Sequence, residues 1–221
     1  MINPVIIIPA YNPPNTFSKL LINIRKITLI PIIIIDDGSN EKIYLETSIN
    51  NIHLIRNKYN LGKGASLLNS FNYAQKHEYS HCITIDADNQ HDPLLIDSFL
   101  NIQSSIEIVC GNRAFNFPMP LHRRISNILT SKICSVITGT NILDSQCGYR
   151  RYKIDKILNI KTIQKGYLFE TEILIKSLRN GYKIEHINIP TIYLNEKSSI
   201  QYIADTMKFI KLILKLLIYK K

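Results

Sequence analysis

The sequence predicts an α/β fold in which a mostly parallel sheet is flanked by helices and followed by a C-terminal amphipathic helix. Short apolar, β-branched runs alternate along the chain with segments whose apolar residues recur at helical spacing. Three of these runs end in polar, small or acidic residues, and the last segment mixes lysines with large apolar residues. Alternation of this kind is typical of parallel sheets that carry helices on both faces.

Composition places the chain among ordinary globular proteins. Its 221 residues suffice for one domain with a full core, and 45% of them are hydrophobic while 20% are charged. Four cysteines without a Cys-x-x-Cys pair argue against the common zinc spacings and suggest reduced thiols in a cytosolic setting. No signal peptide is expected, and the longest apolar run, residues 29–35, is too short to span a bilayer.

The net charge of +10 suggests a polyanionic partner, although general solubility would explain it equally well. A nucleoside diphosphate or an anionic membrane surface fits such a charge. No nucleic acid is expected as a partner, because no basic run is interleaved with aromatic residues in the manner of RNA-binding segments.

The first quarter of the chain is expected to hold three strands and one helix. Continuous apolar runs at residues 5–8, 32–35 and 52–55 predict buried strands. Five large apolar residues at helical spacing predict a helix over residues 16–28, and prolines mark residues 9–14 as a loop.

A glycine-rich segment at residues 60–65 is expected to open a helix that runs to about Lys76. It is not a Walker A loop, because Lys63 is followed by Gly instead of Ser or Thr, and it lacks the third glycine of a dinucleotide fingerprint. Two interpretations stay open: a flexible helix start, or close approach of the backbone to an anion at a helix N-terminus.

The strand predicted at residues 81–85 ends in two acids, Asp86 and Asp88. Residues two apart on an extended segment point the same way, and two adjacent carboxylates are stable mainly beside a cation. Hard oxygen ligands favour Mg²⁺ or Mn²⁺ completed by substrate phosphates, whereas the plain alternative is a solvated acidic turn. Asp92 is the expected N-cap of a following helix that begins at Pro93.

The polar strand ends at residues 9–12, 36–39 and 86–90 are expected to meet, since ligands of such sheets bind outside the carboxyl ends of the strands. The economical interpretation is a single nucleotide site built from all three segments. His91 is expected to support this site as a structural residue next to the helix start, and less as a metal ligand.

These segments, in this order and spacing, resemble family 2 glycosyltransferases with the GT-A fold. The motifs that carry the resemblance are Pro-Ala-Tyr-Asn at 9–12, Asp-Asp-Gly-Ser at 36–39, the glycine-rich segment and Asp-Ala-Asp-x-Gln at 86–90. Later motifs at 110–113, 144–150 and 166–172 extend the resemblance over roughly residues 4–199. It is nearest to the branch of dolichol-phosphate mannose synthase and the polyprenyl-phosphate glycosyltransferases.

The resemblance implies three sets of site residues. The donor would be bound by Pro9, Tyr11, Asn12, Asp37, Lys63, Asp86 and Ala87. Mg²⁺ or Mn²⁺ would be held by Asp86, Asp88 and Gln90. The catalytic set would be Asp88, Arg113 and Lys197. Lys197 stands near the place where relatives of this branch often carry an arginine. Either it replaces that arginine, or the phosphate contact is made differently, because lysine lacks the bidentate fork.

The resemblance implies an inverting, metal-dependent hexosyltransferase that moves a sugar from a nucleotide-sugar donor, of UDP-glucose or GDP-mannose type, to a polyprenyl phosphate. A phosphate acceptor needs no general base, because it is already anionic near pH 7. A glycan or glycolipid hydroxyl would need a carboxylate base, for which Glu170 and Asp144 are candidates. Since Glu170 and Glu172 do not share a helix face, one is expected to reach the site and the other to be solvated or paired. A non-catalytic, membrane-associated nucleotide-sugar-binding module is the remaining alternative.

The pattern of the C-terminal segment predicts a helix over residues 198–221, with Lys208, Lys211 and Lys215 on one stripe. A basic, strongly apolar helix of this kind lies in a membrane interface, or else it packs on the domain or on another subunit. The expected organisation is a GT-A domain at residues 1–199 followed by this helix at residues 200–221. The expected location is the cytoplasm, with peripheral association to the membrane.

Overall fold

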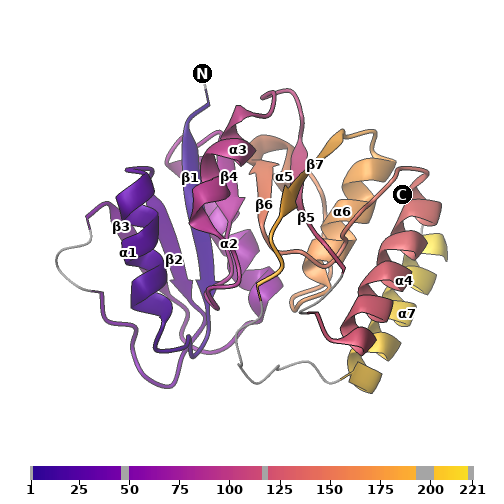
Figure 1. Cartoon of the computed structure of the whole chain (residues 1–221), viewed down its shortest axis with the longest axis horizontal. Helices are drawn as coiled ribbons and strands as arrows, with labels where there is room; N and C mark the ends of the chain where they lie inside the picture. Colours follow the sequence, from indigo (N-terminus) through magenta and orange to yellow (C-terminus); the bar gives the residue numbers. More distant parts are fainter. Residues whose placement is uncertain (1, 46–49, 116–118, 193–201, 219–221) are drawn as a thin grey trace.

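The computed structural model describes residues 2–45, 50–115, 119–192 and 202–218. The strands found there are β1 (Pro4–Ala10), β2 (Ile32–Asp36), β3 (Ile52–Arg56), β4 (His81–Thr84), β5 (Ile108–Arg113), β6 (Arg150–Lys153) and β7 (Ile184–Ile189). They form one sheet in the order β3-β2-β1-β4-β6-β5-β7, which crosses the molecule in Figure 1. The predicted α/β architecture is therefore confirmed.

Helices connect most of these strands. They are α1 (Phe17–Ile27), α2 (Lys63–Lys76), the 3₁₀ turn η1 (Pro93–Leu95), α3 (Ile96–Asn101), α4 (Leu121–Thr138), α5 (Ile154–Leu158), α6 (Phe169–Arg179) and α7 (Tyr202–Ile218). The carboxylate of Asp92 accepts a hydrogen bond from the Leu94 backbone N–H at 3.0 Å, so Asp92 caps η1 as predicted.

Most strand pairs are parallel. β1 pairs in parallel with β2 and β4, β2 with β3, and β5 with β7, whereas β6 runs antiparallel to both β4 and β5. Because β4 and β5 both oppose β6, they run in the same direction. The carboxyl ends of β1, β2, β4 and β5 therefore lie at one edge of the sheet, where ligands of such sheets bind.

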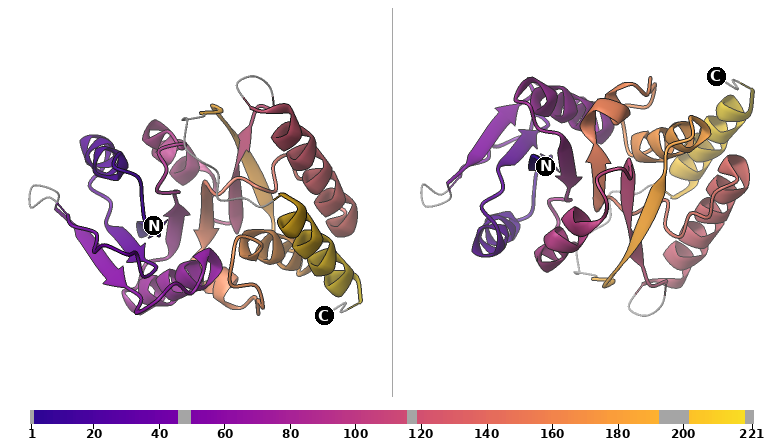
Figure 2. Two further views of the ribbon diagram at one scale, coloured as in Figure 1. Left: turned by 90° about the horizontal axis from the view of Figure 1, so that it is seen from below. Right: turned by 90° about the horizontal axis from the view of Figure 1, so that it is seen from above.

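The two faces of the sheet are covered by different helices. Alternate strand residues point to opposite faces, so Val5 and Ile7 pack with α2, α5, α6 and α7, while Ile6 and Ile8 pack with α1 and α3. The two end-on views in Figure 2 show these helix layers on either side of the sheet. Burial on both faces explains why the strands are continuous apolar runs and do not alternate with polar residues.

Helix α7 packs one face on the domain and exposes another. Phe209, Leu212, Ile213 and Leu216 are buried in the same cluster as the sheet. On the outer side stand exposed apolar residues and three lysines, namely Met207, Ile210, Leu214, Leu217, Lys208, Lys211 and Lys215. Packing on the domain and an exposed amphipathic face thus coexist. The predicted division of the chain at residue 199 stays a prediction.

Helix α4 lies beside α7 at one end of the molecule (Figures 1 and 2). Of its 18 residues, only Ser131 and Cys134 are buried. No helix within the described ranges is long and apolar enough to cross a membrane.

Candidate active site

The three predicted strand ends are joined by hydrogen bonds. The backbone N–H of Asn12 donates to Ser39 Oγ at 2.9 Å, and Asn12 Oδ1 accepts from the Asn40 backbone N–H at 2.8 Å. The loop after β4 reaches the same region, because Asn89 Nδ2 donates to the Thr16 carbonyl at 2.7 Å. The prediction that these three strand ends share one edge of the sheet is confirmed, because β1 pairs in parallel with both β2 and β4. A single nucleotide site at this edge stays a prediction.

Asp37, at the end of β2, is enclosed by protein donors. Its Oδ1 accepts from Asn57 Nδ2 at 2.8 Å and from the Leu61 backbone N–H at 3.0 Å, and its Oδ2 accepts from the Gly62 backbone N–H at 2.8 Å. The glycine-rich segment therefore does approach an anion, as one of the two open interpretations had it, and in this structure that anion is Asp37. A carboxylate at a helix N-terminus is stabilised by the backbone dipoles.

Asp36 is held in a similar way from the neighbouring strand. Its Oδ2 lies 2.5 Å from Arg56 Nη1, and its Oδ1 accepts from the Ser39 backbone N–H at 2.8 Å. Sequence reasoning missed Arg56 and Asn57. Both stand at the carboxyl end of β3, so the strand-end argument used for the other three segments would have found them.

Asp86, which follows β4, forms an ion pair with the side chain of Lys63. Lys63 Nζ lies 2.7 Å from Asp86 Oδ1 and 2.8 Å from Glu170 Oε2, so one ammonium joins two carboxylates. Burial opposes the charge on Lys63, but the two carboxylates outweigh it and raise the pKa of Lys63. Burial likewise opposes the charge on Asp86, yet Lys63 prevails and lowers the pKa of Asp86 to about 2.

His91 supports Asp86 from behind. Its Nδ1 accepts the Asp86 backbone N–H at 3.2 Å, and its ring stacks on Tyr149 at a centroid distance of 5.0 Å. Burial lowers the pKa of His91 to about 4, so the ring is neutral at pH 7. Since Nδ1 accepts a hydrogen bond, Nε2 carries the proton and has no lone pair for a metal. This geometry agrees with the predicted structural role.

Space beside Asp86 depends on a glycine. A Cβ at Gly148 would lie 2.5 Å from Asp86 Oδ2 and 2.9 Å from Lys63 Nζ. Gly148 belongs to the motif at 144–150, but no sequence pattern indicates that it faces Asp86. Any larger residue would displace the Asp86 carboxylate or the Lys63 ammonium.

The acids fit a divalent cation that takes most of its ligands from a bound diphosphate. Asp86 and Asp88 supply hard oxygen atoms, and Asp88 Oδ1 is oriented by the Gln90 backbone N–H at 3.0 Å. Within the described residues, no group of three or more His, Cys, Asp or Glu side chains could hold a metal. Magnesium is commonly held by one or two carboxylates together with substrate phosphates, which is the arrangement that this pair allows.

Arg113, at the end of β5, is locked to Asp144. Arg113 Nε lies 2.7 Å from Asp144 Oδ2, and Nη2 lies 3.1 Å from Oδ1. Asp144 is fully buried, and its Oδ1 also accepts from the backbone N–H groups of Gln146 and Cys147 at 2.9 and 3.1 Å. Four hydrogen bonds therefore occupy Asp144, which makes it a poor general base.

The two glutamates at the start of α6 have separate partners, as expected. Glu170 pairs with Lys63, which also pairs with Asp86. Glu172 accepts from the backbone N–H groups of residues 163 and 164 and pairs with Lys176 at 2.6 Å. Both side chains are buried, so each is held by its partners and neither is solvated.

Of the remaining predicted site residues, those that the structure describes lie at the same edge of the sheet. Pro9 is in β1, and Tyr11, half exposed, follows that strand. Ala87 and Gln90 stand in the segment that carries the acids. Lys197 lies outside the described residues. The ligand contacts assigned to all of these residues stay predictions.

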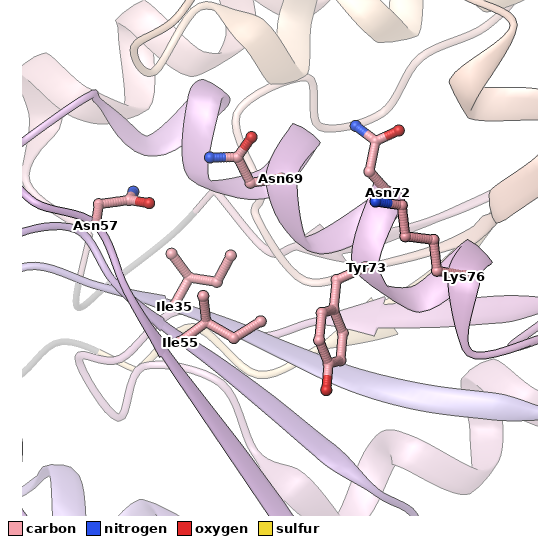
Figure 3. A pocket seen from close by; sticks show the side chains of 7 residues that line it. All are labelled: Ile35, Ile55, Asn57, Asn69, Asn72, Tyr73 and Lys76. Atoms are coloured by element: carbon pink, nitrogen blue, oxygen red, sulfur yellow. The ribbon is translucent and has the colours of Figure 1, made fainter.

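Two cavities lie on the β2 side of the site. The larger, of about 620 Å³, is lined by residues of the loops after β1 and β2, including Asn12 and Ser39. The smaller, of about 310 Å³, is lined by Ile35 and Ile55, with Asn57 on one side and Tyr73 and Lys76 on the other (Figure 3). Asn57 connects the smaller cavity to the site, because its amide donates to Asp37.

Comparison with known proteins decides the family. The model of Glycosyl transferase family 2 matches residues 5–160. The chain belongs to this family. It is a glycosyltransferase, and the predicted resemblance is confirmed.

Curated relatives lie in the predicted branch. The UDP-N-acetylglucosamine–dolichyl-phosphate N-acetylglucosaminyltransferase of Methanococcus voltae is 29% identical over 213 residues, covering 85% of this chain and 85% of the relative. The polyprenol monophosphomannose synthase of Mycolicibacterium smegmatis is 23% identical over 202 residues, covering 84% of this chain and 76% of the relative.

A solved structure supports the GT-A fold. Glucosyl-3-phosphoglycerate synthase from Mycobacterium tuberculosis, in complex with Mn²⁺, uridine diphosphate and phosphoglyceric acid, superposes with a TM-score of 0.73 at 17% identity. The match covers 96% of this chain and 77% of that one. At this identity the likeness concerns the fold alone.

Proposed function

We propose that this glycosyltransferase moves a sugar from a nucleotide-sugar donor to a polyprenyl phosphate, with inversion and with Mg²⁺ or Mn²⁺ as cofactor. The observation that carries the choice of acceptor is the locking of Asp144 by Arg113. The curated relatives named above, which act on dolichyl phosphate or make polyprenol monophosphomannose, support the same choice.

On the donor side, the chain supplies groups that would bind and orient a nucleoside diphosphate. Asp86, Asp88 and Gln90 would hold the cation, and the cation would neutralise the negative charge that develops on the departing diphosphate. Lys63 and Arg113 place two further positive charges at the same edge of the sheet, fixed in advance by their carboxylate partners.

On the acceptor side, the structure favours a nucleophile that is already anionic. A hydroxyl acceptor would need a carboxylate base, but Asp144 has its oxygens occupied and Glu170 is buried against Lys63. A phosphate monoester has a second pKa of about 6 and needs no base at pH 7. A glycan or glycolipid hydroxyl is therefore the less supported acceptor.

The lipid part of such an acceptor would bring the protein to a membrane surface. Helix α7 exposes apolar residues and lysines together, and α4 beside it carries an exposed stripe of Leu121, Ile125, Leu129 and Val136. Apolar residues interspersed with lysines suit the interface of an anionic bilayer. This surface supports the proposed peripheral association.

The transfer reaction is tested with matched acceptors. The purified protein is incubated with Mn²⁺ and UDP-glucose, UDP-N-acetylglucosamine or GDP-mannose, together with a short polyprenyl phosphate or the corresponding polyprenol. We expect one donor to transfer to the phosphate and not to the alcohol, and EDTA to abolish transfer. Transfer to the alcohol at an equal rate would contradict the proposed acceptor.

Membrane association is tested by sedimentation with vesicles. Replacing Lys208, Lys211 and Lys215 by Gln should weaken binding to phosphatidylglycerol vesicles by about tenfold or more, because each lysine near an anionic surface contributes about 1 kcal/mol. The matched control replaces Lys19, Lys26 and Lys76, exposed lysines on α1 and α2, by Gln. Equal losses in both triple variants would show that only net charge matters.

A further inference from the structure

The glycines on either side of Lys63 allow the close packing that positions it. A Cβ at Gly62 would lie 2.6 Å from the Lys165 carbonyl oxygen, and a Cβ at Gly64 would lie 2.4 Å from Phe169 Cβ. The start of α2 is therefore pressed against the segment that leads into α6. This close approach sets Lys63 between Asp86 on one side and Glu170 on the other.

Lys63 and a divalent cation would compete for the same carboxylate. Lys63 Nζ is 2.7 Å from Asp86 Oδ1, so an ammonium already supplies positive charge beside this proposed cation ligand. A dication bound to Asp86 would lie close to that ammonium, and like charges at such a distance repel. Cation binding therefore requires Lys63 to give up at least part of its contact with Asp86.

Glu170 has the capacity to receive Lys63. Its Oε2 already binds Nζ at 2.8 Å, while its Oε1 is buried and has no hydrogen-bond partner among the described residues. An ammonium has three N–H donors, and the lysine side chain is flexible. A small rotation of Lys63 away from Asp86 would bring a second N–H to the unpartnered Oε1.

We propose that Lys63 is an internal counter-ion that holds Asp86 while no cation is bound, and that Glu170 retains Lys63 when a dication takes its place. Glu170 is then a positioning residue that acts on the cation site through Lys63. The arrangement makes cation binding weak in the absence of nucleotide, and it keeps a positive charge ready for the incoming diphosphate. This inference rests on the metal dependence proposed above.

The test measures Mn²⁺ binding without donor or acceptor, by the electron paramagnetic resonance signal of free Mn²⁺. Lys63→Met should bind Mn²⁺ about tenfold or more tightly than the unaltered protein, since it removes a like charge next to the cation. Glu170→Gln should bind it about threefold or more weakly, because Lys63 is then left with Asp86 as its only carboxylate partner.

Two further variants serve as controls for the effect of Lys63→Met. Lys63→Met leaves Glu170 as a buried charge without its partner, so the double variant Lys63→Met/Glu170→Gln removes both charges together and should also bind more tightly than the unaltered protein. The matched control is Lys76→Met, which removes a lysine from the exposed far end of the same helix and should leave Mn²⁺ binding unchanged.

The outcomes separate this inference from the proposed function. If both variants that lack Lys63 bind Mn²⁺ no more tightly than the unaltered protein, the counter-ion role is wrong while the metal site stands. Unchanged binding in Glu170→Gln contradicts the role of Glu170. If the unaltered protein binds no Mn²⁺ even with UDP or GDP added, the metal dependence itself is wrong, and this inference is wrong with it.

Discussion

The two acid-bearing strand ends differ in what holds their carboxylates. After β2, Asp37 receives two backbone N–H groups and an amide, and Asp36 receives a backbone N–H and a guanidinium. After β4, Asp86 is held by the single ammonium of Lys63, with His91 at 3.9 Å. Backbone donors cannot leave without unfolding the loop, whereas a lysine side chain can rotate away.

The acids after β2 therefore have a structural role, whereas Asp86 after β4 has a counter-ion that can be exchanged. The β2 end is closed by its own chain, and its acids fix the loops that border the site. The β4 end keeps its acids partly exposed, and its counter-ion can be replaced. We therefore expect substitutions after β2 to lower stability and substitutions after β4 to lower activity.

The largest expected effect is the loss of activity in Asp88→Ala. Removing a ligand of the cation that stabilises the departing diphosphate should lower kcat by about 10³-fold. The free energy of unfolding should change by less than about 1 kcal/mol, because Asp88 is partly exposed and the hydrogen bond that it accepts from the Gln90 backbone N–H is local. Initial rates of transfer and urea unfolding check both parts. A variant with normal turnover would remove Asp88 from the site.

The second effect belongs to the β2 end. Asp37→Ala should lower the free energy of unfolding by about 3 kcal/mol, because it leaves the donors of Asn57, Leu61 and Gly62 without their acceptor in a buried position. Urea unfolding of this variant beside Asp88→Ala makes the comparison direct. Equal stability of the two variants would show that the two strand ends do not differ as described.

The smallest expected effect is a pH dependence of the free energy of unfolding, which arises from His91 beside Asp86. His91 has a pKa of about 4 when folded against 6.5 when unfolded, so the unfolded chain takes up the proton first on acidification. The free energy of unfolding of the metal-free protein should therefore fall by about 2 kcal/mol between pH 7 and pH 5. Asp86 contributes in the same direction only below about pH 4, since its pKa falls from 3.8 to about 2.

The variant His91→Asn isolates this contribution. Its side-chain oxygen can still accept the Asp86 backbone N–H, but it carries no titratable group. Urea unfolding at pH 7 and pH 5 should give a smaller difference for this variant than for the unaltered protein. An identical difference would mean that the pH dependence comes from other groups.

Strand ends at which polar residues directly follow a buried apolar run could be predicted from the sequence. The apolar runs before Asn12, Asp37 and Asp86 predicted their strands and their common edge, and the structure joins these segments by hydrogen bonds. Applied to the third run, the same reasoning points to Arg56 at the end of β3 but does not identify its partner. That partner, Asp36, is 20 positions away, and no local pattern indicates the pairing.

The sequence by itself determined the α/β alternation, the polar ends of the strands and the family, because each depends on the order of residues along the chain. Only the tertiary structure decided which charges meet. Lys63, Asp86, Gly148 and Glu170 come from four separate segments and converge through the packing of α2, β4 and α6. Contacts between distant segments depend on how the helices cover the sheet, and that packing is a property of the folded chain as a whole.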